Sequence, residues 1–308
     1  MVTHILFNLL GKIAIMVLFG YVLKKTGIIN DELQKGLSNL LLKAILPASI
    51  LSSSANEFSK ELAWGLGITA LSCSLYYLLT LIISHFIAKS FKTDNNTKKI
   101  FITMSVFANV GFMGFPVISE LFGSNGMLYA VIYNMFFQLF FFTYGINLLS
   151  SQDKLNISSI FKSPITLTSF LAIIIYISPF RFPAFINEAL STIGGVMVPL
   201  SMMIIGCTLV GINLKDILKD KYSYFVSLLR LLVFPVAIIL ALEVLGVKGD
   251  AAAVVAILTA LPSGSLNVIV AEQYDCNPKY AARTVIQTMS LMIFTLPFII
   301  ILAMKVLM

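Results

Sequence analysis

The sequence predicts an all-α polytopic membrane protein with ten transmembrane helices. We expect these to form two inverted five-helix repeats, with broken, crossing fourth and ninth helices. Of the 308 residues, 58% are hydrophobic and 11% are charged, whereas a soluble domain carries about 25% charged residues. The apolar residues form ten stretches, each near the length of about 20 residues that crosses a bilayer. Two of these stretches are interrupted by proline, glycine and polar side chains.

The predicted spans follow one another with short connections, so little of the chain remains for a soluble domain. The first span contains Lys12 and lacks a small-residue cleavage site, which indicates a retained helix rather than a secretory signal. The longest connection runs from Ser150 to Ser163. In chain order the predicted spans are residues 4–24, 34–54, 62–88, 100–122, 126–149, 164–180, 188–212, 222–246, 250–274 and 279–306.

Basic residues are distributed unequally between the two sides of the predicted bundle. The connections after the odd-numbered spans, with their flanks, hold thirteen lysines, and the opposite side holds four basic residues. Because the cytoplasmic side of a membrane protein is enriched in lysine and arginine, we expect the protein to lie in the cell membrane with both termini on the extracellular side. The net charge of +7 then reflects topology, and no nucleic-acid partner is expected. The thirteen are Lys24, Lys25, Lys35, Lys89, Lys92, Lys98, Lys99, Lys154, Lys162, Lys215, Lys219, Lys221 and Lys279, and the four are Lys60, Arg181, Lys248 and Lys305.

Residues 1–150 and 151–308 show signs of an internal repeat, because four pairs of identical residues are each separated by 152 positions. Five spans per half is an odd number, so the second half starts on the other side of the membrane and the repeat must be inverted. Inverted repeats with interrupted helices are typical of secondary transporters, whose substrate sites lie near the bilayer midplane. The pairs are Pro47 and Pro199, Ser49 and Ser201, Asn125 and Asn277, and Ala130 and Ala282.

The two interruptions read NVGFMGFP at residues 109–116 and LPSGSLN at residues 261–267. Proline removes a backbone donor and clashes with the preceding turn, and glycine weakens the helix. Hydrocarbon offers no water to the freed groups, so such breaks persist only where they are buried in protein or line a cavity. The N-termini of the half-helices carry partial positive charge that suits an anion. The residues expected to shape the crossing are Gly111, Gly114, Pro116, Pro262 and Gly264.

Polar side chains in and near the interruptions are the candidates for substrate binding. An asparagine in hydrocarbon must find a partner, so Asn109 and Asn267 are expected either to donate to a substrate carboxylate or to bond the freed backbone. The serine hydroxyls at the second interruption have the same two alternatives. Asn134 and Gln138 are expected either to line the cavity or to bond neighbouring helices, and Lys43 either to face the anion or to snorkel. The candidates are Asn109, Asn267, Asn134, Gln138, Ser263, Ser265, Ser49 and Lys43.

Charged side chains inside the spans are few. Lys12, Arg230 and Arg283 lie within two or three turns of a span end, so snorkelling is the first explanation, with an ion pair as the alternative for Arg230. The span acids lie toward the ends, and mid-membrane carboxylates, which would carry a coupling cation, are lacking. This argues against cation antiport as the main activity and leaves the coupling ion open, and a cation or neutral-solute carrier is the alternative within transport. The acids concerned are Glu120, Glu243 and Glu272.

Enzymatic function is disfavoured, because the sequence has no HExxH motif, no paired aspartates and only two histidines, His4 and His85. The three cysteines, Cys73, Cys207 and Cys276, lie far apart without metal-ligand spacing. We therefore expect no metal or other cofactor. The inverted repeat likewise disfavours a receptor or scaffold.

Four segments resemble the auxin efflux carrier family, and the similarity covers essentially the whole chain. They are NVGFMGFPVISELFG at 109–123, PLSMMIIGCTL at 199–209, RLLVFP at 230–235, and residues 261–297, which carry LPSG, AEQY and LP. The sequence resembles a bacterial member of this family, which includes the plant PIN-FORMED transporters and bacterial malate and malonate permeases.

The resemblance implies a scaffold set and a transport set of helices, a homodimer, and transport of a small organic anion by alternating access. The anion is expected to be a mono- or dicarboxylate such as malate or malonate, or an auxin-like acid. Pro116 matches the family's first crossover proline, whereas Asn267 stands where plant members have the second. The long cytoplasmic loop of many plant members is absent, which puts plant-type regulation in doubt.

Overall fold

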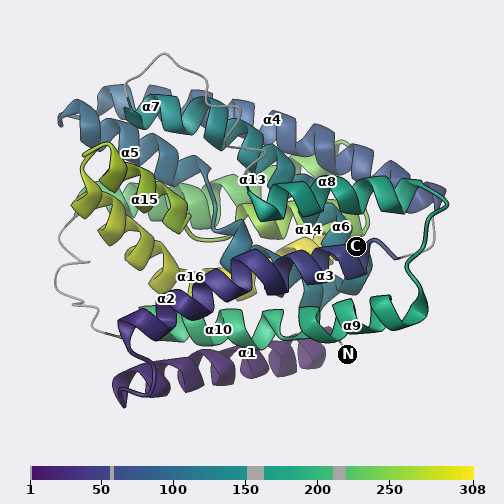
Figure 1. Ribbon diagram of the computed structural model, residues 1–308. Coiled ribbons are helices and arrows are strands. Elements are labelled where there is room, and N and C mark those ends of the chain that lie inside the picture. Colours follow the sequence, from purple (N-terminus) through teal and green to yellow (C-terminus); the bar gives the residue numbers. More distant parts are fainter. Residues whose placement is uncertain (1, 56–58, 151–162, 211–219) are drawn as a thin grey trace. The chain divides into compact units, whose positions relative to one another are not determined.

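The computed structural model describes residues 2–55, 59–150, 163–210 and 220–308, with side chains from residue 11 onward. Within these ranges the regular structure is helical, apart from one isolated β-bridge (Figure 1). Six helical stretches are long and apolar enough to cross a membrane, and two shorter apolar helices cover Pro164–Ile177 and Asp250–Thr259. The all-helical class is confirmed, while the count of ten spans and the inverted repeat stay predictions.

Helices overlie each of the predicted ranges, and several ranges are divided by π-helical turns. Gly123 (φ 59°, ψ −147°) kinks α6, so this helix covers parts of the predicted fourth and fifth spans. The helices are α1 Val2–Lys25, α2 Asp31–Leu40, α3 Leu46–Ser53, α4 Lys60–Ser90, α5 Asn95–Val106, α6 Phe115–Phe140, α7 Ile146–Ser150, α8 Pro164–Ile177, α9 Ala184–Gly195, α10 Met197–Thr208, α12 Lys221–Leu228, α13 Phe234–Val244, α14 Asp250–Thr259, α15 Ser265–Gln273 and α16 Pro278–Leu307, and the π-turns are η1 Leu41–Ile45, η2 Val110–Gly114, η3 Phe141–Gly145 and η5 Leu229–Val233.

Three of the π-turns end two residues before a proline: Pro47, Pro116 and Pro235. Inside an α-helix, the proline ring clashes with the carbonyl four residues earlier and removes a hydrogen bond. A π-turn locally widens the helix and is one of the known ways to accommodate such a disturbance. Each proline then occupies the second position of the following α-helix, where a missing N–H matters little. These prolines therefore reshape their helices without ending them.

Packing divides the chain into two compact units that each draw on both halves of the sequence. Unit 1 comprises the described parts of residues 1–66, 111–132 and 161–212, and unit 2 those of 67–110, 133–160 and 213–308. This division by packing differs from the repeat halves 1–150 and 151–308, which rest on the sequence alone and stay a prediction.

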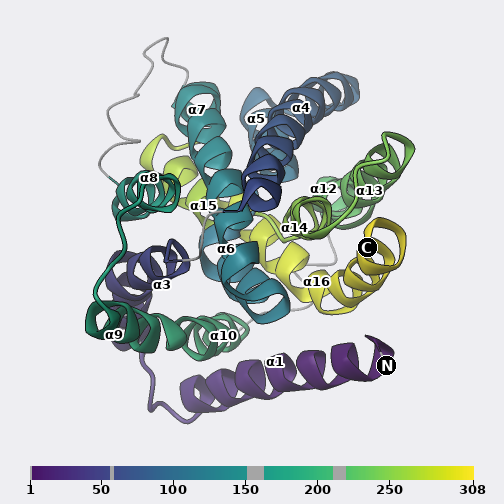
Figure 2. The same cartoon turned by 90° about the vertical axis from the view of Figure 1, so that its right-hand side faces the viewer.

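Helices α1 and α10 lie side by side in unit 1 (Figures 1 and 2). Their backbones approach so closely that a Cβ atom on Gly20 would overlap the Met203 backbone, and one on Gly206 would overlap the Val17 carbonyl. The Cys207 thiol donates to the Gly20 carbonyl at 3.3 Å. Small residues commonly allow this close approach between membrane helices.

Substituting Gly20 with leucine should separate α1 from α10, because the new side chain meets backbone atoms that cannot rotate away. Overpacking of this kind costs about 1–3 kcal/mol or more. We expect a lower melting temperature for purified Gly20→Leu in detergent. The matched control is Gly11→Leu in the same helix, because nothing lies within 4 Å of its Cβ position. Equal melting of the two variants would contradict the close contact.

Helix α14 forms the centre of unit 2. Every residue from Ala251 to Thr259 is buried, as expected for a helix that is apolar on all sides. Helices α13 and α16 pack directly on α14 (Figure 2), and α16 also contacts α5, α12 and α15. The interruption that follows α14 is therefore surrounded by protein.

Candidate functional site

In unit 2 the chain leaves helical geometry in the interior of two predicted spans. Helix α5 ends at Val106, Phe107 is extended (φ −99°, ψ 110°), and η2 starts at Val110. The first break thus lies at residues 107–109, earlier than the predicted 109–116, because η2 accommodates the following proline. The second break lies at residues 260–264, between α14 and α15, and Asn267 falls inside α15.

The two breaks are hydrogen-bonded to each other. The Asn109 amide donates to the Pro262 carbonyl at 2.9 Å, and the Gly264 amide donates to the Phe107 carbonyl at 2.9 Å. These bonds flank an antiparallel bridge between Ala108 and Ser263. Backbone groups released by one interruption are therefore satisfied by the other, as irregular backbone requires at membrane depth.

Glycine is required at position 264 by this close approach. A Cβ atom there would lie 2.9 Å from the Ala108 oxygen and 3.2 Å from the Ala108 carbonyl carbon. Distances this short to backbone atoms can be relieved only by moving one strand of the bridge. The second interruption thus depends on Gly264 for its pairing with the first.

Two predicted polar residues hold the paired backbones together. The Ser263 hydroxyl donates to the Met104 carbonyl at 2.8 Å. The Asn267 side-chain amide donates to the carbonyls of Gly264 at 2.9 Å and Phe107 at 3.3 Å. These contacts correspond to the backbone-bonding alternative. The Asn267 Oδ1 atom is buried and has no hydrogen-bond partner among the described residues.

Arg230, in the π-turn η5, links the ends of the two helices that precede the breaks. Its Nε donates to the Leu261 carbonyl at 2.9 Å, and its Nη1 donates to the carbonyls of Ser105 at 3.1 Å and Val106 at 2.6 Å. Nη1 also lies 3.3 Å from the Tyr76 hydroxyl. The C-terminal carbonyls of a helix carry partial negative charge, which a cation stabilises.

The expectation that Arg230 snorkels is wrong, because its side chain is fully buried. Among the described residues it is the only buried charged side chain, and no carboxylate lies within salt-bridge distance of it. Its contacts come from segments far away in sequence, so the ion-pair alternative gives way to bonds with backbone carbonyls. Its Nη2 atom is buried without a partner among the described residues.

Aromatic rings lie around Tyr76, which contacts this guanidinium, and further buried polar side chains belong to α6. Tyr76 lies with its ring centroid 5.2 Å from that of Tyr77 and 6.4 Å from that of Tyr133. On α6, Asn134 and Gln138 are both buried and, being four residues apart, lie on one helix face. The Asn134 Nδ2 atom has no partner among the described residues.

The remaining predicted site residues are distributed over both units. Ser265 is half-buried at the first position of α15 in unit 2. The others belong to unit 1, where Ser49 is half-buried and Lys43 is exposed. The structure thus joins Asn109, Pro262, Ser263, Gly264 and Asn267 directly, and the other roles stay predictions. Those unit 1 residues are Ser49 in α3, Lys43 in η1, Gly111 and Gly114 in η2, and Pro116 in α6.

Comparison with known proteins identifies the class of this molecule. Residues 5–159 and 151–300 match the sequence model of a family described as membrane transport protein. An uncharacterized transporter of Methanocaldococcus jannaschii is 27% identical over 297 residues, covering 92% of this chain and 95% of the relative. An uncharacterized transporter of Methanothermobacter thermautotrophicus is 26% identical over 290 residues, covering 93% of this chain and 94% of the relative. The chain therefore belongs to the membrane transport protein family, that of the auxin efflux carriers, and is a multi-pass membrane protein.

Proposed function

We propose that this protein is a secondary transporter that moves a small organic anion across the cell membrane by alternating access around the paired interruptions. The observation that carries the proposal is the backbone pairing of residues 107–109 with residues 260–264. Irregular backbone inside a membrane protein is tolerated only where protein or a cavity satisfies it, and in transporters such breaks form the substrate site.

The charge at the interruptions favours an anion. Arg230 places a positive charge beside both breaks, and its contacts within the described ranges are carbonyl oxygens and a tyrosine, with no carboxylate among them. A buried charge without a counter-ion is costly, and a bound anion lowers that cost. Arg230 Nη2 and Asn134 Nδ2 are buried donors without partners among the described residues. The site chemistry therefore suits a carboxylate better than a cation or a neutral solute.

The finer features of the proposal rest on the sequence. A mono- or dicarboxylate such as malate or malonate is the leading substrate class, with an auxin-like acid as the alternative. We place both termini outside the cell because basic side chains gather on the opposite side. A homodimer is proposed from the family resemblance.

The test is ligand-induced thermal stabilisation of the purified protein by malate, malonate, succinate, lactate and indole-3-acetate. A ligand that binds only the folded state raises the melting temperature. We expect one of these acids to raise the melting temperature. Asn109→Ala and Asn134→Leu should each weaken the binding of that acid about tenfold or more, because a lost hydrogen bond to a charged group costs about 1.5–3 kcal/mol. The same acid should accumulate in proteoliposomes that contain the wild-type protein.

Asn95→Leu is the control, because Asn95 is exposed at the start of α5. Binding should be unchanged in this variant. If the folded wild-type protein binds no carboxylate, the anion proposal fails and neutral and cationic solutes become the candidates.

A further inference from the structure

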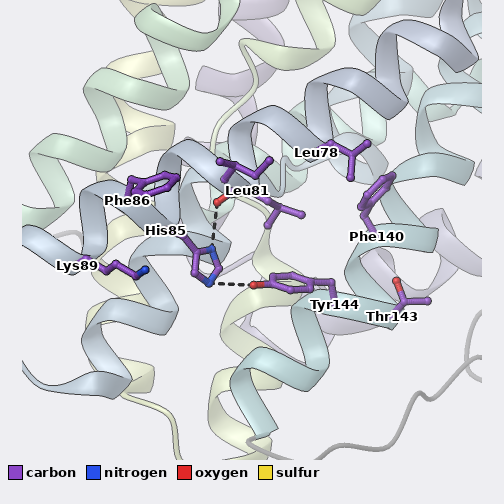
Figure 3. A pocket seen from close by; sticks show the side chains of 9 residues that line it. Leu78, Leu81, His85, Phe86, Lys89, Phe140, Thr143 and Tyr144 are labelled. Carbon is purple, nitrogen blue, oxygen red and sulfur yellow. Dashed lines mark hydrogen bonds between the residues drawn. The ribbon is translucent and has the colours of Figure 1, made fainter.

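A separate cavity of about 460 Å³ lies in unit 2 between α4 and the segment formed by the end of α6 and η3. Figure 3 shows its lining. Leu78 and Phe140 lie at one end with Thr143 near them, Lys89 and Phe86 lie at the other, and His85 and Tyr144 lie between them. The end with Leu78 and Phe140 is largely apolar, and the other end carries a cation. None of its lining residues takes part in the paired interruptions.

The polar middle of the cavity is held by two hydrogen bonds. His85 Nδ1 lies 3.0 Å from the Leu81 carbonyl oxygen, which can only accept, so Nδ1 carries a proton. His85 Nε2 lies 2.9 Å from the Tyr144 hydroxyl and, in the neutral ring, accepts its proton. The imidazole and phenol groups therefore satisfy each other and fix the cavity wall (Figure 3).

Lys89 brings a positive charge to the cavity that no acidic side chain in the described part of the chain compensates. Its ammonium group lies 5.5 Å from the centre of the Phe86 ring. Among the described residues no carboxylate lies within 4 Å of it. A cation at the end of an apolar cavity favours an anionic group attached to an apolar one.

The surroundings of the cavity indicate that its ligand arrives from the bilayer. Ile82 and Phe86, which line the cavity, are 53% and 68% exposed, and Leu79 and Ile83 on the same helix are exposed as well. In a membrane-spanning helix an exposed apolar surface of this kind contacts lipid. A ligand entering over this surface must itself be hydrophobic in part.

We propose that this cavity binds an anionic phospholipid, with an acyl chain along Leu78, Ile82 and Phe140 and the phosphate beside Lys89. Basic side chains at the membrane surface attract anionic lipids by about 1 kcal/mol each, and basic pockets between membrane helices bind lipid head groups. The proposal is independent of the transported substrate, because it rests on α4, α6 and η3 alone.

The test is lipid binding by the detergent-purified full chain after delipidation. Native mass spectrometry measures the bound lipid while the protein is titrated with phosphatidylglycerol or with phosphatidylcholine. We expect the wild-type protein to prefer phosphatidylglycerol. Lys89→Gln should weaken that binding about fivefold, the equivalent of one surface basic residue. Lys92→Gln removes the same charge from a residue that does not line the cavity, and it should leave binding unchanged. Equal effects of the two variants would overturn the proposal.

A second pair of variants tests the apolar end. Ile82→Trp should fill the cavity and displace phosphatidylglycerol, whereas Ile83→Trp, at an exposed neighbour that does not line it, should not. If Ile82→Trp binds phosphatidylglycerol as strongly as the wild-type protein does, the lipid binds elsewhere and the assignment is overturned. Titration with oleate separates the two sources of an anionic amphiphile: saturable binding of oleate but not of phosphatidylglycerol would reject the phospholipid.

Discussion

Replacing Arg230 with methionine is expected to abolish transport and to destabilise the protein by roughly 3 kcal/mol or more, because three buried backbone carbonyls lose their hydrogen-bond donor. Methionine fills similar space but donates no hydrogen bond. The carbonyls of Ser105, Val106 and Leu261 would then be buried without the donors that now serve them. Each unsatisfied buried group costs about 1–3 kcal/mol. The measurements are melting temperature in detergent and substrate accumulation in proteoliposomes.

Two further variants separate charge from geometry. Arg230→Lys keeps the charge, but one ammonium group cannot replace both Nε and Nη1 of a planar guanidinium, so it should restore little stability. Arg181→Met is the matched control. Arg181 also donates to three backbone carbonyls, those of Ile175, Ser178 and Phe180, but it is exposed, so water can replace it. If Arg230→Met and Arg181→Met melt alike, Arg230 does not hold the interruptions together.

The helix positions could be predicted from the sequence because apolar runs of membrane length leave few alternatives. The second interruption was located nearly correctly because it contains Pro262 and Gly264, which act locally on the backbone. The first was predicted too late in the chain. Residues 107–109 contain neither proline nor glycine, and they leave the helix because they pair with residues 260–264. Pro116, the local signal, is instead accommodated by η2.

The role of Arg230 could not be predicted from its distance to a span end. Its acceptors lie 31, 124 and 125 residues away in sequence, and only the folded unit 2 brings them together. The available signal was an arginine in an apolar stretch without an acid nearby, five residues before Pro235. A cation in that setting needs backbone carbonyls as partners when no carboxylate is at hand.

Replacing Gly264 with alanine is expected to reduce transport at least as strongly as loss of a single substrate contact. The new Cβ would lie 2.9 Å from the Ala108 oxygen, so the two interruptions must move apart. This movement strains the bond from the Asn109 amide to Pro262 and the bond from the Gly264 amide to Phe107. Hydrogen–deuterium exchange of the peptide around Asn109 reports on the pairing directly, because a lost bond exposes its amide.

The control for this substitution is Gly67→Ala in α4, where nothing lies within 4 Å of the added Cβ. It adds the same methyl group and should leave exchange and transport at wild-type levels, with a small gain in helix propensity. Faster exchange together with lost transport in Gly264→Ala alone would show that transport requires the paired interruptions. Faster exchange with normal transport would instead mean that the pairing is structural, and the substrate pathway would have to be sought away from the interruptions.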